Sequence, residues 1–260
     1  MSIQITASLV KELRDSTGVS VMQCKNALEE ASGDMEKALI ILKKKSSSIA
    51  MKKAGRNASE GMIVVKEEDG KTLLLVLNTE TDFVAKNVDF INLANKLADL
   101  AIKEGIENMK SQSKEIIDEI VQKVGEKIEL GKVEEIKGSI IGSYIHNNKS
   151  AVIVSLSSGT KELARDIAMH IAAMKPAFVS SLDITEEDKK KVIEVFEKEV
   201  SESDKGEDIK KKMLEGKIST YFKEQTLMDQ FFIKNPEFTI EKLLKNNNAK
   251  LISYVRESIN

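Results

Sequence analysis

The sequence has little of what metal sites, disulfides and covalent catalysis need. It contains one cysteine, Cys24, two histidines, His146 and His170, and no tryptophan. A single cysteine excludes an internal disulfide and suits a reducing compartment. Neither histidine has a His or Cys neighbour at the spacing of metal ligands or of a nucleophile pair. We therefore expect no metal site and no cofactor of the chain's own.

A phosphate-binding loop is also missing. Such a loop needs two glycines five positions apart, followed by Lys and then Ser or Thr. Gly125 and Gly131 are one position too far apart, and Lys132 is followed by Val133. We expect a binding protein rather than an enzyme, with no catalytic residues.

Long apolar runs and a strong net charge are absent as well. No segment reaches the roughly 18 apolar residues of a membrane span, and the N-terminus lacks the basic and apolar segments of a signal peptide. There are 40 basic and 42 acidic residues, a net charge of -2. This balance is unlike that of an overall cationic nucleic-acid binder. We expect a cytoplasmic protein without a membrane partner.

Residues 1–54 predict a small domain of three short helices. Thr6, Ser20 and Asp34 each offer a capping oxygen before an apolar face with helical spacing. The polar, basic runs Lys43–Ser48 and Lys52–Asn57 have little apolar content and predict a hinge region. We place the first domain boundary after this basic linker.

The rest of the chain repeats one unit, which predicts two related lobes at residues 55–138 and 139–260. Each reads as a hairpin, a helix, a shorter helix and a closing strand, with antiparallel sheets and helices on one face. The fold class is therefore α+β. The hairpin strands are expected at Met62–Lys66 with Thr72–Leu77, and at Ile140–His146 with Ala151–Leu156.

An addition to the second lobe, residues 183–226, predicts an antiparallel helical hairpin. Its narrow apolar seam among many charged residues is typical of a projecting coiled coil. The residues expected to face one another are Val192, Val195, Phe196 and Val200 on one arm, and Ile209, Met213, Ile218 and Phe222 on the other.

An addition of about four residues to the first lobe falls in Asn78–Asn87, between a strand and a helix. It places Phe83 on a turn, and the residues alone leave two readings open: a plug packed on its own lobe, or an exposed contact residue. For His170, at the edge of an apolar stripe, the residues favour a satisfied core histidine. Three basic runs, at Lys43–Lys45, Lys189–Lys191 and Lys210–Lys212, keep an RNA- or ribosome-associated protein as an alternative.

Three motifs resemble the bacterial elongation factor Ts family, the guanine-nucleotide exchange factors of elongation factor Tu. One is Thr81–Asn87, and another is His170–Pro176. The third is N-terminal: Leu9–Arg14, Thr17, Gly18, Met22, Cys24, Lys25, Ala27 and Leu28. The likeness runs in order along nearly the whole chain.

The resemblance implies a ubiquitin-associated-like helical domain, a two-lobed core and a coiled-coil arm. It implies that Asp82 and Phe83 approach the partner's magnesium-side switch region, and that His170 helps to hold a partner helix. The N-terminal domain would engage the nucleotide-binding domain. The remaining expected partner-binding residues are Arg14, Met22, Lys25, Thr81, Val84 and Lys86. The chain itself would carry no cofactor, acting on the Mg2+ and GDP bound by its partner, with no direct nucleic-acid contact.

Some positions depart from the family pattern. Val21, Gln23 and Asn26 stand where Met, Asp and Lys are expected, and Phe231 replaces a proline. The stretch from Ser253 onward is short and lacks a glutamate- and glycine-rich ending. We expect weaker binding to the partner, with binding itself retained.

Overall fold

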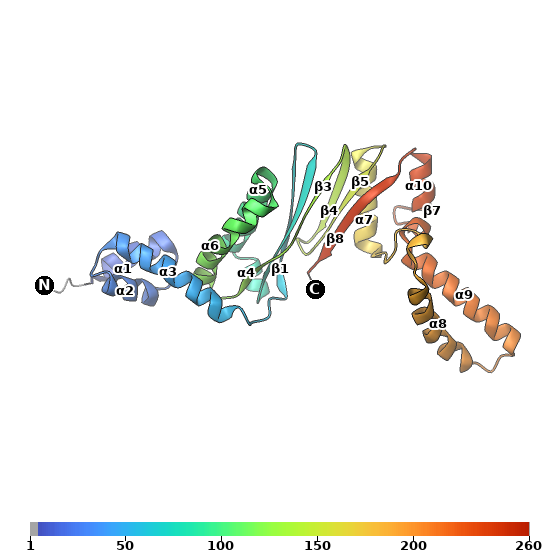
Figure 1. The fold of residues 1–260 in the computed structure, drawn as a ribbon, viewed down its shortest axis with the longest axis horizontal. Coiled ribbons are helices and arrows are strands. Elements are labelled where there is room, and N and C mark those ends of the chain that lie inside the picture. The colour runs from blue at the N-terminus through green and yellow to red at the C-terminus, as the bar shows by residue number, and fades with distance from the viewer. Residues whose placement is uncertain (1–4, 260) are drawn as a thin grey trace. The chain divides into compact units, whose positions relative to one another are not determined.

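The computed structural model describes residues 5–259 and has the mixed helix and sheet content of the α+β class (Figure 1). It divides into two compact units. The first contains the chain up to Ile136, the short segment Ile145–Ala151 and the residues from Glu257 onward. The second contains Lys137–Tyr144 and Val152–Arg256.

The first unit begins with three helices, α1 (Ala7–Thr17), α2 (Val21–Glu30) and α3 (Met35–Lys53). The predicted caps are confirmed, since the side chains of Thr6, Ser20 and Asp34 each accept a hydrogen bond from a first-turn amide. A small apolar core lies between the helices. It is formed by Val10, Leu13, Val19, Cys24, Ala27, Leu28, Ala31, Ala38 and Leu42.

The first part of the expected hinge region, Lys43–Ser48, is wrong, because α3 continues through it; the helix ends at Lys53, within the second part, Lys52–Asn57. Long-range contacts explain the difference. Ser46 is buried, the Ser47 hydroxyl donates to Asp118 Oδ2 at 2.6 Å, and Lys43 pairs with Glu115. Both acids lie on α6 (Ile106–Val124), so the polar run is one side of a helix–helix contact.

The first sheet has the strand order β1-β2-β3, with β1 (Glu60–Glu68), β2 (Lys71–Thr79) and β3 (Ile128–Lys137). β1 and β2 are antiparallel and joined by Asp69 and Gly70, which have φ of 46° and 74°. Two residues with positive φ make the turn whose twist suits a tight hairpin. The predicted hairpin is confirmed.

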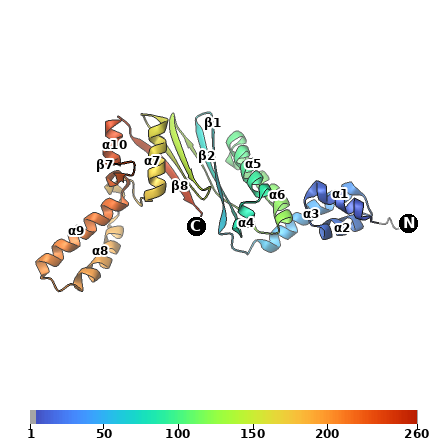
Figure 2. The same cartoon turned by 180° about the vertical axis from the view of Figure 1, so that it is seen from behind.

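Two helices complete this lobe's core. α5 (Val88–Glu104) packs on β1 and β2, and α6 packs on α5, as Figure 2 also shows. The second helix was expected to be the shorter, which is wrong: α6 has 19 residues and α5 has 17. The apolar residues that fill the core include Leu73, Leu75, Leu77, Val84, Phe90, Leu93, Leu97 and Met109.

The second unit contains most of a sheet of order β4-β5-β8, built from β4 (Ile140–His146), β5 (Ser150–Leu156) and β8 (Leu251–Ser258). Its core joins the sheet to α7 (Lys161–Met174) and α10 (Ile240–Asn246) through Val152, Val154, Leu156, Ile167, Ile171 and Leu244. A two-stranded sheet, β6 (Phe231–Phe232) with β7 (Asn235–Thr239), precedes α10.

A helical hairpin, α8 (Glu186–Ser201) and α9 (Glu207–Gln225), lies within the predicted insertion. Its seam is narrower than expected, because Val195 and Ile209 are 63% and 51% exposed. Tyr221 was not among the residues predicted for the seam. Its ring nevertheless lies edge-on to the rings of Phe196 and Phe222, with centroid distances of 5.9 and 5.4 Å.

Replacing either of two glycines of the second unit by alanine is expected to change the unfolding free energy, in opposite directions. A Cβ at Gly142 would lie 2.2 Å from the Arg165 nitrogen of α7, whereas one at Gly216, inside α9, meets nothing within 4 Å. We expect Gly142→Ala to cost roughly 1–3 kcal/mol of unfolding free energy, as overpacking does. Gly216→Ala should add about 0.5–1 kcal/mol by its helix propensity.

Urea unfolding followed by tyrosine fluorescence measures both changes, because all three tyrosines, at 144, 221 and 254, lie in the second unit. An unchanged midpoint for Gly142→Ala would contradict the close packing of β4 on α7.

Candidate functional site

The predicted turn after β2 contains a single turn of helix, α4 (Asp82–Ala85). Thr81 begins it with an extended backbone, and its hydroxyl accepts a hydrogen bond from the Val84 amide at 3.4 Å. Asn87 then caps α5, accepting from the Asp89 amide at 2.8 Å. Two caps six residues apart hold α4 as a separate element between strand and helix.

Two neighbouring side chains of α4 differ in burial. Val84 is buried in the core of the first lobe, whereas Phe83 is 82% exposed. Val88, the first residue of α5, is 66% exposed. The reading of Phe83 as a plug of its own lobe is therefore excluded. The turn presents an aromatic ring to solvent and is held by the residue beside it.

Asp82 and Lys86 form an ion pair across this turn, with Lys86 Nζ 2.7 Å from Asp82 Oδ2. The hydrogen bond from Lys86 lowers the pKa of Asp82 and raises the pKa of Lys86. The positive charge of Lys149, itself paired with Glu60 at 2.6 Å, lowers the pKa of Asp82 further. A carboxylate that is ionised at neutral pH thus lies next to the exposed ring.

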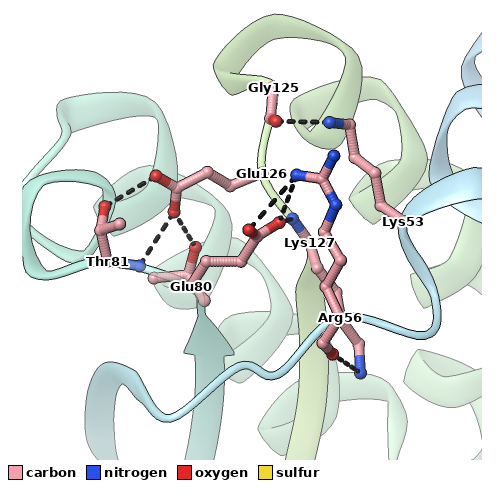
Figure 3. A network of polar contacts seen from close by, with 8 residues as sticks. Lys53, Arg56, Glu80, Thr81, Gly125, Glu126 and Lys127 are labelled. Carbon is pink, nitrogen blue, oxygen red and sulfur yellow. Dashed lines mark hydrogen bonds and ion pairs between the residues drawn. The ribbon is translucent and has the colours of Figure 1, made fainter.

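The start of the turn is anchored by Glu126, which sequence reasoning missed. Its carboxylate accepts hydrogen bonds from the Thr81 amide (3.0 Å), the Thr81 hydroxyl (2.7 Å) and the Thr79 hydroxyl (3.1 Å) (Figure 3). Glu126 lies 45 residues beyond Thr81 and carries no motif. Only the fold brings the two together.

The N-terminal candidates lie on the helical bundle. Met22 is 65% exposed and Lys25 is exposed one turn later on α2, where it pairs with Glu29 at 3.7 Å. Arg14 is exposed in the last turn of α1. Gln23, by contrast, accepts a hydrogen bond from Gln122 of α6 at 3.0 Å. Arg14, Met22 and Lys25 face solvent on elements separate from α4.

His170 is fully buried, as its place in an apolar stripe predicts. Its Nδ1 accepts from the Ile233 amide at 3.4 Å, and its Nε2 lies 3.0 Å from Gln230 Oε1, so the ring is neutral with its proton on Nε2. Burial lowers the pKa of His170. The side chain ties α7 to the segment around Phe231, whose ring is 62% exposed.

Within residues 5–259 no cluster of three or more His, Cys, Asp or Glu side chains is arranged to hold a metal ion. No helix in this described range combines the length and apolar character needed to cross a bilayer.

A family model described as elongation factor TS matches residues 80–260, a range that begins at the exposed turn. The chain belongs to the elongation factor Ts family. Proteins named elongation factor Ts are 39% identical in Marinobacter nauticus, over 97% of this chain and 90% of the relative, and 39% identical in Aeromonas salmonicida, over 97% and 89%. One from Legionella pneumophila is 38% identical over 98% and 92%. The resemblance carried by the three motifs is confirmed.

Burial of His170 predicts a pH dependence of stability in the second unit. Its folded pKa lies below the ordinary 6.5, so the unfolded chain binds the proton first as pH falls. The contribution is fully present above about pH 6.5 and is lost as pH falls below it, by up to about 1.4 kcal/mol per pH unit. Unfolding free energies from tyrosine fluorescence between pH 7.5 and 5 measure this slope.

The matched control is the exposed histidine of the chain, His146. We expect His146→Gln to keep the slope and His170→Gln to remove most of it. Equal slopes in all three proteins would contradict a buried, neutral His170.

Proposed function

We propose that this chain is a guanine-nucleotide exchange factor for elongation factor Tu. It binds the GDP form of its partner and promotes GDP release by disturbing the magnesium and phosphate site, which allows GTP to load. The observation that carries the proposal is Phe83, a ring that is 82% exposed on a turn held by the buried Val84. Membership of the elongation factor Ts family supports the choice of partner.

No covalent step is needed for this activity. A factor that binds the empty partner more tightly than the loaded one weakens nucleotide binding by the same ratio. Burying one phenylalanine supplies only about 1.5–3 kcal/mol, so Phe83 alone does not expel a tightly held nucleotide. Contacts from several parts of the chain must add to it.

We assign those contacts to the domains expected from the sequence. Residues 1–54, a ubiquitin-associated-like domain, engage the partner's nucleotide-binding domain through Arg14, Met22 and Lys25. The lobe at 55–138 brings Asp82 and Phe83 to the magnesium side, with Thr81, Val84 and Lys86 holding the turn. In the lobe at 139–260, the buried His170 acts on a partner helix by fixing the segment that carries Phe231. The hairpin at 183–226 is a coiled-coil arm.

The basic runs favour this function over RNA binding. Each run contains a lysine that is paired with a carboxylate: Lys43 with Glu115, Lys189 with Glu186, Lys191 with Glu187 and Lys210 with Glu207. Paired lysines are typical of solvated helix faces.

Free GDP is expected to dissociate the complex with elongation factor Tu, whereas RNA binding would weaken steeply with salt.

Phe83→Ala is expected to leave the fold intact, because the ring contributes little to its own core, and to slow stimulated GDP release. Loss of about 1.5–3 kcal/mol of burial in the complex corresponds to a rate roughly ten- to hundredfold lower. Release of a fluorescent GDP analogue from elongation factor Tu measures the rate.

Leu182→Ala is the matched control, since Leu182 is an apolar residue that is 94% exposed and lies outside the proposed contact set. Its stimulated rate should equal that of the unmodified chain. If the rate with Phe83→Ala also matched that of the unmodified chain, the proposed role of Phe83 in GDP release would be wrong.

Asp82→Asn separates the action on magnesium from the insertion of Phe83. If the Asp82 carboxylate acts through the partner's Mg2+, its removal should slow stimulated release in magnesium buffer and have no effect when a chelator has already removed the metal. Phe83→Ala should slow release under both conditions. An Asp82→Asn defect that persists in the chelator would assign Asp82 a different role.

A further inference from the structure

Two segments far apart in the sequence hold each other beside the candidate site. Glu80, at the end of β2, accepts a hydrogen bond from the Lys127 amide at 2.6 Å, and Glu126 accepts one from the Thr81 amide at 3.0 Å (Figure 3). In each segment, therefore, a glutamate binds the amide that follows the other glutamate. We call this reciprocal pair, Glu80 with Glu126, the clasp.

The end of the helical bundle is attached to the same clasp. Arg56 Nη1 lies 3.2 and 3.3 Å from the two oxygens of Glu80, and its carbonyl accepts from Lys127 Nζ at 3.1 Å. Lys53, the last residue of α3, donates to the Gly125 carbonyl at 2.6 Å. Figure 3 shows these side chains converging on the connection between α6 and β3. Three segments thus meet at two carboxylates.

The turn that carries Phe83 has few other supports. α4 has four residues, and an isolated helical turn is not stable by itself because nucleation is unfavourable. Val84 anchors its middle in the core, Thr81 caps its start, and the Asp82–Lys86 ion pair spans it. All three hydrogen bonds of the Glu126 carboxylate go to Thr79 and Thr81, and bonds to an ionised acceptor are the strong ones.

We propose that Glu126 and Glu80, with Arg56, are positioning residues for nucleotide exchange. The clasp fixes the start of α4, so that Phe83 meets the partner in one orientation, and it joins that turn to the helix bundle that carries Met22 and Lys25. Ordering a loop during binding costs free energy, and a loop ordered in advance avoids that cost. This inference rests on the proposed role of Phe83.

The first test needs no partner. Glu126→Gln keeps the size of the side chain but replaces one acceptor oxygen by a donor. We expect hydrogen exchange of the amides of Val84, Ala85 and Lys86 to rise about tenfold, the factor that corresponds to losing one hydrogen bond to a charged group. Amides in the middle of β1 and β2 should be unchanged. The same protection of α4 in both proteins would overturn the clasp.

The matched control is Glu129→Gln. Glu129 lies three residues further on, is 54% exposed at its side chain and pairs with Lys127 Nζ at 2.7 Å. Within residues 5–259, the bonds to Thr79 and Thr81 come from Glu126 and not from Glu129. It should leave both the exchange of α4 amides and the rate of stimulated release as they are.

The second test is a double-mutant cycle on the maximal rate of stimulated GDP release at saturating factor. Glu126→Gln should lower this rate about tenfold, and it should have little further effect in the Phe83→Ala background, because the two changes remove one action. If Glu126→Gln acted only by weakening the fold, the factors by which the two substitutions lower the rate would multiply. Equal effects in both backgrounds, or no effect in either, would overturn the proposal.

Arg56→Gln provides an independent variant, because this side chain is half exposed and its loss does not threaten folding. It should also slow release, in a way that depends on Phe83. If the unmodified chain did not stimulate release at all, the proposed function would fail, while the hydrogen-exchange result would still decide whether the clasp orders α4.

Discussion

A ring exposed to water is held in place by what lies behind it, and for Phe83 that is the burial of Val84. One side chain of α4 is sealed in the lobe's core and the next is 82% exposed. A helical turn of four residues has no stability of its own. The free energy that fixes the ring therefore comes from the core beneath it and from the hydrogen bonds at its start. The packed core of β1, β2, α5 and α6 therefore holds the candidate site in position.

This arrangement separates two tasks that a single residue does not perform well. An apolar ring that also packed on its own lobe would have to leave that site before binding a partner, and the lost burial would offset the gain. Val84 supplies the packing, so the apolar surface of Phe83 remains exposed and available for the proposed complex. The cost is an apolar ring exposed to water, and Val88, five residues later, is exposed as well. The ion pair of Asp82 and Lys86 places two charges next to that ring, and charges of this kind limit nonspecific association.

Local patterns in the sequence were enough to predict most elements but few of their contacts. Thr6, Ser20 and Asp34 cap helices as expected, and Asp69-Gly70 closes the expected hairpin, because caps and tight turns depend on neighbours in the chain. The Lys43–Ser48 run looked like a hinge because the helix it packs on, α6, is distant in the sequence. Ser47, for example, bonds to Asp118, 71 residues later. The motif around Phe83 was visible, whereas Glu126 was not, since a glutamate after a glycine predicts nothing by itself. Side chains whose role is a distant hydrogen bond become apparent only in the fold.

Asp82 and Phe83 contribute differently to the proposed release of GDP. In the free chain Asp82 Oδ2 is bound to Lys86, and this ion pair competes with the action on a magnesium shell that we propose. An exposed ion pair contributes little free energy, less than the burial of a phenylalanine side chain supplies. The free energy gained by burying the Phe83 ring in the proposed complex therefore exceeds the free energy lost on breaking the Asp82–Lys86 pair. The hydrogen bond from Lys86 lowers the pKa of Asp82 and so keeps its carboxylate ionised, and in the proposed complex the position of the Phe83 ring sets where that carboxylate lies.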